Sequence, residues 1–435
     1  MVAIIGFAAM LALIAARMPV GLAMLAVGSV GLVYMNGWGP FVASMKTNPY
    51  EQFASPTLAV IPLFILMGAF AERSGMARDL FSAARVLVGH LKGGLAMSVL
   101  FACTIFGAIC GSSVATTATF GRAALPELRR YRYDDGFSTA TIAIGGVVDL
   151  LIPPSIILVV YAIATEQNII KLFKAALIPG LLAVLFYSAT IAILVRRNPG
   201  IAPTSPKSDR AEILPALMLA TPAVLVIAIV IGGIYGGVFA PHDAAAVGCI
   251  AMLAVGLLQG RFGWSEMRYS LLQTAETTAM IFMILLGAAV FNAFLGRTQL
   301  PTQAAEFVSG LGLQPILVMA VFMLFYLLLG AVMDELAMLL LTLPVFFPVV
   351  KALDFGMPPD EVAIWFGVCV LIVVGIGLTA PPMGLNVFVV SAIAKDVPIV
   401  KTYRAILPFV AADVLRLAIM IAFPWLSLVL VRLWK

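Results

Sequence analysis

The sequence has few charged residues, few histidines and few cysteines, and each shortage excludes a class of protein. Asp, Glu, Lys and Arg make up 11% of the 435 residues, against about 25% in soluble domains. Two histidines, and four cysteines without a CxxC pair, do not predict a metal site or a disulfide framework. In their place 63% of the residues are hydrophobic. A water-soluble fold cannot bury so much apolar surface, so we expect an all-α polytopic membrane protein.

The net charge of +5 does not indicate nucleic-acid binding, because the basic residues lie in short clusters between apolar segments. Arg17 follows the first apolar segment, and no basic region precedes that segment, so no cleavable signal peptide is predicted. The positive-inside rule then predicts an N-terminus outside the cytoplasm. With this orientation 18 of the 26 Lys and Arg residues lie in inside loops.

Ten segments meet the requirement of about 20 mostly apolar residues for a membrane span. They are predicted at 2–16, 19–36, 56–72, 136–165, 173–195, 212–236, 241–259, 271–296, 360–393 and 403–431. Two further apolar blocks, at about 93–126 and 313–350, are long enough to enter the membrane twice, but small or polar residues interrupt them near the middle. We expect both blocks to be re-entrant helical hairpins.

The chain is predicted to have five parts. They are N-terminal scaffold helices at 1–55, a first repeat at 56–195, a cytoplasmic linker at 196–210, connecting scaffold helices at 211–270 and a second repeat at 271–435. The first repeat contains the hairpin at about 93–126 and a broken helix at about 136–165. The second contains the hairpin at about 313–350 and a broken helix at about 360–393. The linker, RRNPGIAPTSPKSDR, has proline, serine and charge but no apolar periodicity.

The two halves of the chain are similar to each other. IPPSIILVVYAIATEQNIIKLFKAALIP at 152–179 matches APPMGLNVFVVSAIAKDVPIVKTYRAILP at 380–408, and FILMGA at 64–69 matches MILLGA at 283–288. An odd number of predicted crossings separates the copies, so they have opposite orientations. Inverted repeats with broken helices are typical of secondary transporters, where each copy builds one gate.

A Pro-Pro pair interrupts one apolar segment in each half. Pro153-Pro154 and Pro381-Pro382 remove backbone donors and clash with the preceding turn, so each pair predicts a broken helix. Carbonyls freed inside a membrane are tolerated only within protein or beside a wet cavity. Such carbonyls are good ligands for Na⁺, and the alternative is a simple helix kink.

Each predicted hairpin has polar residues at its tip. The first has Ser112 and Ser113, whose hydroxyls can coordinate an ion or simply allow close helix packing. The second has adjacent carboxylates, Asp334 and Glu335, which are costly in apolar surroundings and therefore indicate function. Asp334 matches Ser112 in the repeat, so we predict that it is an ion ligand or supports an ion site, with a purely structural hydrogen-bonding role as the alternative.

Two further acidic residues are open to more than one interpretation. Asp149 lies four residues before the first Pro-Pro pair and either tunes an ion or substrate site or pairs with a basic residue. Asp243, after His242, is predicted to cap a helix that begins in an outside loop. A catalytic His–Asp pair is the alternative, but no nucleophile motif accompanies it.

The run GSSVATTATFGRAALPELRRYRYDDGFSTATIAIGGVVDLLIPPSIILVVYAIATEQNIIKLFKAALIPGLL at 111–182 resembles the large membrane subunit of TRAP (tripartite ATP-independent periplasmic) transporters. GIGLTAPPMGLNVFV at 375–389 and GGVFAPHDAAAVG at 236–248 resemble two further motifs of that family, and the likeness covers essentially the whole chain. The resemblance implies an elevator-type transporter of the bacterial inner membrane, with its N-terminus in the periplasm, that takes up an organic acid such as a carboxylate or sulfonate.

The resemblance also implies a coupling ion and partners. Na⁺ is the expected coupling ion, with no organic cofactor. A periplasmic substrate-binding protein delivers the acid, and a small four-helix membrane subunit braces the large one.

Carried over by position, the family's sites fall on both hairpin tips and both helix breaks. The first Na⁺ region comprises Ser112, Ser113, Gly145 and Asp149. The second comprises Gly330, Asp334, Gly377, Thr379 and Pro381. The substrate is expected near Ser155 and Asn386.

The sequence departs from the family in three places. Ala380 stands where Thr usually precedes the second Pro-Pro pair, with Thr379 one residue earlier, so the hydroxyl ligand there is either shifted or replaced. The middle motif reads Ala-Pro-His-Asp instead of Thr-Pro-Thr-Glu. Asp149 replaces the usual Gly or Pro and is a candidate mark of a different substrate.

Three other functions are alternatives for a membrane protein of this composition. One is a single-chain Na⁺- or H⁺-coupled anion permease that needs no binding protein. Another is an intramembrane enzyme, but HExxH, GxSxG and His/Cys clusters are absent from the sequence, so no enzyme is predicted. The last is a channel, which has no need for inverted broken repeats.

Overall fold

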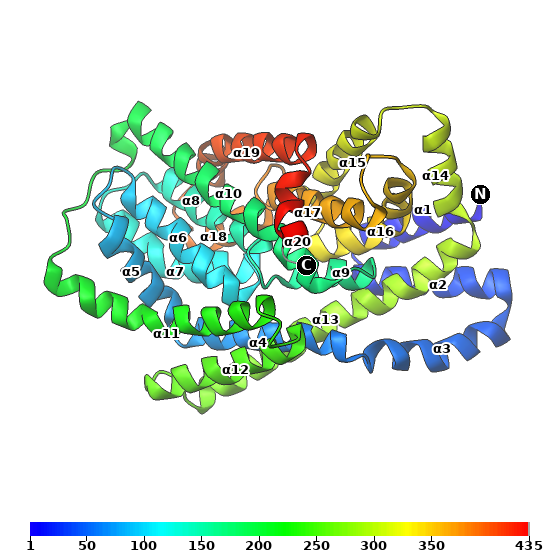
Figure 1. Cartoon of the computed structure of the whole chain (residues 1–435), viewed down its shortest axis with the longest axis horizontal. Helices are drawn as coiled ribbons and strands as arrows, with labels where there is room; N and C mark the ends of the chain where they lie inside the picture. The colour runs from blue at the N-terminus through cyan, green and yellow to red at the C-terminus, as the bar shows by residue number, and fades with distance from the viewer. Residues whose placement is uncertain (434–435) are drawn as a thin grey trace.

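The computed structural model describes residues 1–433, and within them all the regular secondary structure is helical (Figure 1). Eight of the helices in this described part are long and apolar enough to cross a membrane. The prediction of an all-α polytopic membrane protein is therefore confirmed. The N-terminal helices are α1 (Val2–Ala15), α2 (Val20–Asn36) and α3 (Trp38–Phe53).

The first repeat is a sequence of helices that ends before the linker. It comprises η1 (Pro56–Ala59), α4 (Val60–Arg73), α5 (Met76–Val88), α6 (Gly94–Cys110), α7 (Ser113–Arg130), α8 (Asp135–Val147), η2 (Val148–Leu150), α9 (Ile156–Ala164) and α10 (Ile169–Arg197). The linker contains η3 (Pro199–Ile201), and two helices follow it, α11 (Arg210–Tyr235) and α12 (Pro241–Leu258).

The second repeat has the same order of helices. It comprises α13 (Trp264–Arg297), α14 (Leu300–Gly310), α15 (Pro315–Gly330), α16 (Glu335–Ala352), α17 (Pro359–Gly377), α18 (Leu385–Ile393) and α19 (Ile399–Ala422), followed by α20 (Trp425–Leu433). The match extends to the caps. Gly75 before α5 and Gln299 before α14 both have left-handed backbone, and the side chains of Ser112 and Asp334 cap α7 and α16.

The structure corrects three expectations about the elements. The predicted span at 403–431 is two helices, α19 and α20, because Pro424 has no backbone N–H with which to continue the helix. Three helices were not predicted, namely α3, α5 and α14. Asp243 does not cap α12, which begins at Pro241 with Ala240 as its N-cap residue.

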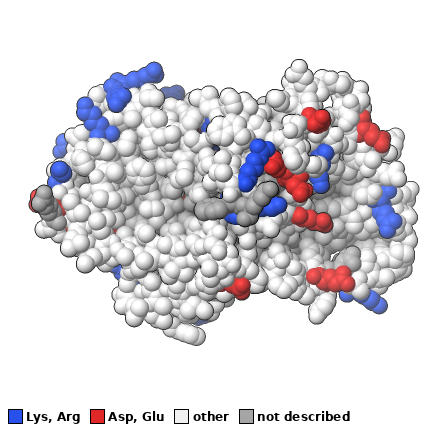
Figure 2. Space-filling model, viewed as in Figure 1, with Lys and Arg blue, Asp and Glu red and all other residues white. Residues whose placement is uncertain are grey.

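Burial differs sharply between the inner and the outer helices. Every residue of α17 from Val362 to Gly377 is buried, whereas α11 exposes large apolar side chains such as Leu214, Met218 and Leu225. Apolar side chains on the outer helices are what a lipid-facing surface requires. Lys and Arg side chains gather at the end of the molecule that carries the α10–α11 linker (Figure 2); the cytoplasmic position of this linker stays a prediction.

Small residues bring α2 against α13. A Cβ atom on Gly21 would lie 2.8 Å from the carbonyl oxygen of Met283, and one on Gly28 would lie 2.8 Å from the backbone nitrogen of Phe291. Close backbone approach through glycine is a common way of joining membrane helices. These contacts bind the N-terminal helices to the start of the second repeat.

Candidate ion and substrate site

Two residues, Gly111 and Ser112, form the tip between α6 and α7. Gly111 has left-handed backbone (φ 60°), and the Ser112 hydroxyl accepts a hydrogen bond from the backbone N–H of Ala115 at 3.4 Å. A Cβ atom on Gly111 would lie 3.1 Å from the Pro154 carbonyl oxygen. The first hairpin tip therefore packs directly on the first Pro-Pro pair.

Glycines on α8 let the arms of the first hairpin approach closely. A Cβ atom on Gly146 would lie 2.0 Å from the Thr117 hydroxyl and 2.7 Å from the Ser113 carbonyl oxygen. On the neighbouring residue, a Cβ atom on Gly145 would lie 2.7 Å from the Cys103 sulfur. The region before the first break is thus enclosed by both α6 and α7.

Asp149 is fully buried in the same region, on η2. A Cβ atom on Gly107 of α6 would overlap the Asp149 carboxylate, so α6 and η2 pack closely at this point. Thr116 lies beside Asp149, yet neither carboxylate oxygen accepts a hydrogen bond of normal geometry from the described residues. The hydroxyls of Thr116 and Thr117 are also buried without a partner among these residues. Several oxygen atoms of α7 and η2 are therefore available to a cation or a proton.

Asn386 connects the second repeat to this region. Its side-chain oxygen accepts a hydrogen bond from the Ser113 hydroxyl at 3.0 Å, and its amide donates to the Ala143 carbonyl at 3.2 Å. Ser113 and Asn386 are both fully buried. One side chain of α18 therefore holds the start of α7 against α8 and links the second broken helix to the first hairpin.

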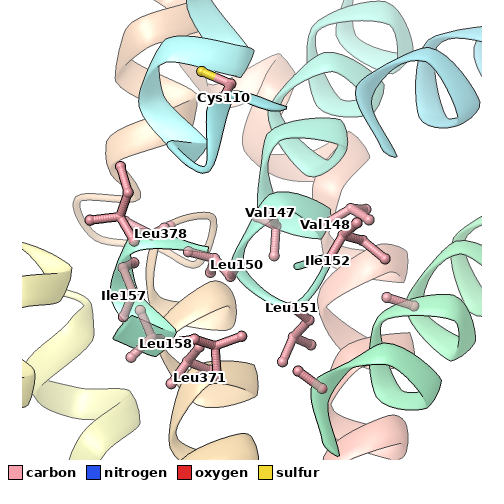
Figure 3. Close-up of a cluster of buried hydrophobic side chains, with 14 of the residues drawn as sticks. Cys110, Val147, Val148, Leu150, Leu151, Ile152, Ile157, Leu158, Leu371 and Leu378 are labelled. Atoms are coloured by element: carbon pink, nitrogen blue, oxygen red, sulfur yellow. The ribbon is translucent and has the colours of Figure 1, made fainter. Parts of the chain in front are cut away.

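The first break lies between η2 and α9. Pro153 and Pro154 stand in the non-helical segment, and the fully buried Ser155 caps α9 by accepting a hydrogen bond from the Leu158 N–H at 3.5 Å. Apolar side chains surround the break, and they come from the break itself, from α17 and from the hairpin tip (Figure 3). They include Val147, Leu150, Leu151, Leu371, Leu378 and Cys110.

The second hairpin tip is more open than the first. Asp334 is exposed, and its Oδ1 atom accepts hydrogen bonds from the backbone N–H groups of Leu336 at 2.9 Å and Ala337 at 3.4 Å. A Cβ atom on Gly377 would lie 2.8 Å from the Gly330 backbone, so this hairpin packs on the end of α17. Asp334 is thus a helix cap whose second carboxylate oxygen remains available.

The second break has no counterpart to the hydroxyl that the family would place before Pro381. Ala380 is buried, and the Thr379 hydroxyl hydrogen-bonds to the carbonyls of Gly375 and Ile376 in the preceding turn of α17. After Pro382 the chain turns at Gly384, which has left-handed backbone (φ 46°). In this conformation Thr379 is turned back onto α17.

The structure brings together the predicted residues of each region but does not test their roles. Ser112, Ser113, Gly145 and Asp149 lie around one part of the α6–α7–α8 bundle, and ion binding there stays a prediction. Substrate binding by Ser155 and Asn386 also stays a prediction, since both residues are fully buried in this conformation. The Asn386–Ser113 link was not predicted, because 273 residues separate its ends.

A buried ionic network joins α10 of the first repeat to α19 of the second. Arg416 and Asp413 on α19 form an ion pair with 2.7 Å between Nη2 and Oδ1, and their side chains are 1% and 0% exposed. Tyr187 of α10 donates to Asp413 at 2.5 Å, and Arg416 donates to the Pro179 carbonyl at 3.2 Å. This network accounts for the two charges that interrupt the apolar pattern of α19.

A second connection between the repeats lies at the surface. Lys401 pairs with Asp134 at 2.9 Å, and Arg129 pairs with Asp396 at 2.7 Å. The hydrogen bond from Arg129 lowers the pKa of the exposed Asp396 carboxyl. These pairs join the end of α7 and the start of α8 to the α18–α19 corner.

Two similar helix series of opposite predicted orientation, each with a broken helix beside a helical hairpin, define a secondary transporter. Residues 7–426 match the family described as the tripartite ATP-independent periplasmic transporter, DctM component. The chain belongs to this family, and it is the large permease subunit of a TRAP transporter, not an enzyme.

Relatives and a solved structure support the same assignment. The chain is 36% identical to the C4-dicarboxylate TRAP transporter large permease protein DctM of Pseudomonas aeruginosa, over 89% of each chain. It is 31% identical to the sialic acid TRAP transporter large permease protein SiaM of Vibrio cholerae, over 98% of this chain and 97% of that one. The crystal structure of the Alcanivorax borkumensis YdaH transporter has the same fold, with a TM-score of 0.67 at 15% identity over 94% of this chain and 98% of that chain.

Proposed function

We propose that this permease imports an organic acid, a carboxylate or sulfonate, together with Na⁺. The observation that carries the proposal is the set of buried oxygen atoms without partners around the first hairpin tip. Asp149, Thr116 and Thr117 contribute these atoms, all from elements that enclose the α7–α8 contact. Carboxylate, hydroxyl and carbonyl oxygens are ligands for hard cations, and buried polar atoms without partners are costly unless a ligand satisfies them.

The second Na⁺ region is proposed at the second hairpin tip. Asp334 uses one carboxylate oxygen to cap α16 and keeps the other free. The contact of Gly330 with Gly377 holds this tip against the end of α17. Thr379 donates its hydroxyl hydrogen to backbone carbonyls of α17, and its oxygen lone pairs remain free. Since residues 380–382 are Ala, Pro and Pro, this oxygen is the one side-chain ligand that residues 379–382 can offer an ion.

An elevator motion is supported by how the helices are joined. Asn386, the Arg129–Asp396 pair and the Tyr187–Asp413–Arg416 network connect the first hairpin and both broken helices into one body. The α2–α13 contacts are not part of this set of connections. We propose that the connected helices, as a first group, carry substrate and ions while α2 and α13, as a second group, stay fixed with the small membrane subunit.

The relatives' names supply the substrate class. Because C4-dicarboxylate and sialic acid are named for permeases 36% and 31% identical to this chain, a carboxylate is the substrate class that we propose. A periplasmic binding protein is proposed to deliver it.

Uptake in proteoliposomes tests the proposal. The permease and its small membrane partner are reconstituted, and entry of a labelled C4-dicarboxylate is followed with and without binding protein and an inward Na⁺ gradient. We expect uptake only when both are present. Uptake that needs the Na⁺ gradient but no binding protein would indicate a single-chain permease instead, and uptake independent of both would refute Na⁺ coupling.

A further inference from the structure

A cavity of about 390 Å³ lies apart from the candidate ion regions, where three separate parts of the chain meet. They are the junction of α4 and α5, the middle of α7, and the turn between α12 and α13, which gather at one end of the molecule (Figure 1). Its volume falls within the roughly 300–1,000 Å³ of small-molecule sites. Its charged lining comprises Glu72, Arg73, Arg78, Asp79, Arg122 and Arg261.

The lining of the cavity has an excess of positive charge, with four arginines against two acids. Arg122 of α7 pairs with Glu72 of α4 at 2.9 Å, and Arg261 pairs with Asp79 of α5 at 2.5 Å. These pairs account for both acids. Two arginines are therefore left without a carboxylate, and an anion is the ligand whose charge complements the site.

The two remaining arginines differ in their surroundings. Arg73 lies over the ring of Tyr269, with 3.4 Å between its Cζ atom and the ring centroid, which fixes the guanidinium without neutralising it. Arg78 is exposed and has no ion-pair partner within residues 1–433. Both guanidiniums line the same cavity, and a guanidinium presents paired N–H donors that suit a carboxylate.

An independent observation on α7 also indicates a ligand. Thr119 is only 8% exposed, and its hydroxyl has no hydrogen-bond partner in the described chain. It lies on the cavity wall. A buried hydroxyl without a partner is uncommon in folded proteins, and an oxygen atom of a bound anion would accept its hydrogen.

We infer that this cavity binds a small di- or tricarboxylate anion on the side of the protein that the distribution of basic residues predicts to be cytoplasmic. The cavity lies between the two proposed groups of helices, since α7, which carries Arg122, belongs to the first group, whereas the turn with Arg261 leads directly into α13 of the second. A bound anion would hold α7 against the α4–α5 junction. If the proposed elevator motion occurs, a carboxylate accumulated inside the cell would therefore slow further uptake, and only this consequence rests on the proposed function.

Binding is tested on the purified full chain in detergent, without Na⁺ or binding protein. Citrate and succinate are added at constant ionic strength with chloride as the balancing anion, and the midpoint of thermal unfolding is followed. A ligand that binds only the folded protein raises this midpoint with its concentration. We expect a saturable rise with citrate, and roughly tenfold weaker binding of citrate by R78Q because a charged hydrogen-bond donor is lost.

Two further variants complete the test. T119V keeps the side-chain volume but removes the hydroxyl, and it is expected to weaken citrate binding several-fold. R130Q is the matched control, because Arg130 is on the same helix but does not line the cavity, and its binding should equal that of the wild type. Equal citrate affinity in R78Q, T119V and the wild type would overturn the inference, as would a rise that never saturates.

A lipid phosphate is the competing source of negative charge. The same titration is therefore repeated in nanodiscs of neutral lipid and of anionic lipid. Citrate binding in neutral nanodiscs supports the site, whereas saturation by anionic lipid with no response to citrate would overturn it. Because none of these measurements involves transport, a failure of Na⁺-driven uptake and a failure of this site are distinguishable.

Discussion

Removing Arg416 is expected to destabilise the protein strongly, because the substitution leaves a buried carboxylate with too few partners. In Arg416→Met, Asp413 would remain 0% exposed and keep only the hydrogen bond from Tyr187, while the Pro179 carbonyl would lose its donor from Arg416. Breaking a buried ion pair from one side typically costs about 3–5 kcal/mol. We expect a loss of this size in the free energy of unfolding, measured in mixed detergent micelles.

A double variant separates the contribution of the ion pair from the cost of leaving one buried charge unpaired. Replacing both charges with apolar residues of similar size is often neutral or stabilising, so Arg416→Met with Asp413→Leu should recover most of the stability. The control is Arg432→Met, because the Arg432–Glu361 pair is 51% and 21% exposed and exposed pairs contribute about 0–1 kcal/mol. A loss in Arg416→Met no larger than in the control, or a double variant as unstable as the sum of its parts, would refute the reasoning.

Three other substitutions test the candidate ion regions. Asp334→Asn should fold normally, since Asn caps a helix as well as Asp does, but it should lose Na⁺-dependent uptake. Asp334→Ala should in addition lose about 1 kcal/mol of stability. Wild-type Na⁺ dependence in Asp334→Asn would contradict a role in ion binding. Asn386→Ala leaves the Ser113 hydroxyl without its acceptor, and such a loss typically costs about 1–3 kcal/mol. The apparent Na⁺ affinity of this variant in uptake should therefore fall roughly tenfold. An unchanged affinity would argue against coupling through the Asn386–Ser113 hydrogen bond. Gly146→Ala should lower the free energy of unfolding by about 1–3 kcal/mol through overpacking. Gly232→Ala is the control, because no atoms lie within 4 Å of the added carbon, and no such loss is expected. Equal thermal unfolding midpoints of the two variants would contradict the close α7–α8 contact.

The broken helices and hairpins could be predicted because their signals are local. A Pro-Pro pair removes two backbone donors wherever it stands, and its recurrence in both halves of the sequence pointed to equivalent elements. The α19–α20 boundary had the same kind of signal in Pro424. The apolar composition continues across this boundary, however, and composition alone does not report a missing N–H group.

The short helices α5 and α14 were not predicted for a different reason. At 13 and 11 residues they are too short to cross a membrane, and a search for apolar spans passes over them. Their equivalent positions become evident only when the left-handed residues that precede them, Gly75 and Gln299, are compared in three dimensions.

The polar contacts of the candidate site could be predicted only in part. The spacing of Asp413 and Arg416 places them on one face of a helix, so their pairing can be predicted from the sequence. Tyr187 and Pro179 come from the other repeat, and no local pattern identifies them as partners. Asn386 was expected to contact substrate, yet its hydrogen bonds to Ser113 and Ala143 depend on the packing of three helices.

The measurement that tests the central claim most directly is the initial rate of organic-acid uptake into proteoliposomes as the Na⁺ gradient is varied. The permease, its small membrane partner and the binding protein are present throughout, and K⁺ replaces Na⁺ at constant ionic strength. Na⁺ coupling through the two hairpin tips predicts a rate that rises steeply with external Na⁺ and falls to background without it. A rate that stays the same when K⁺ replaces Na⁺ would contradict the proposed function.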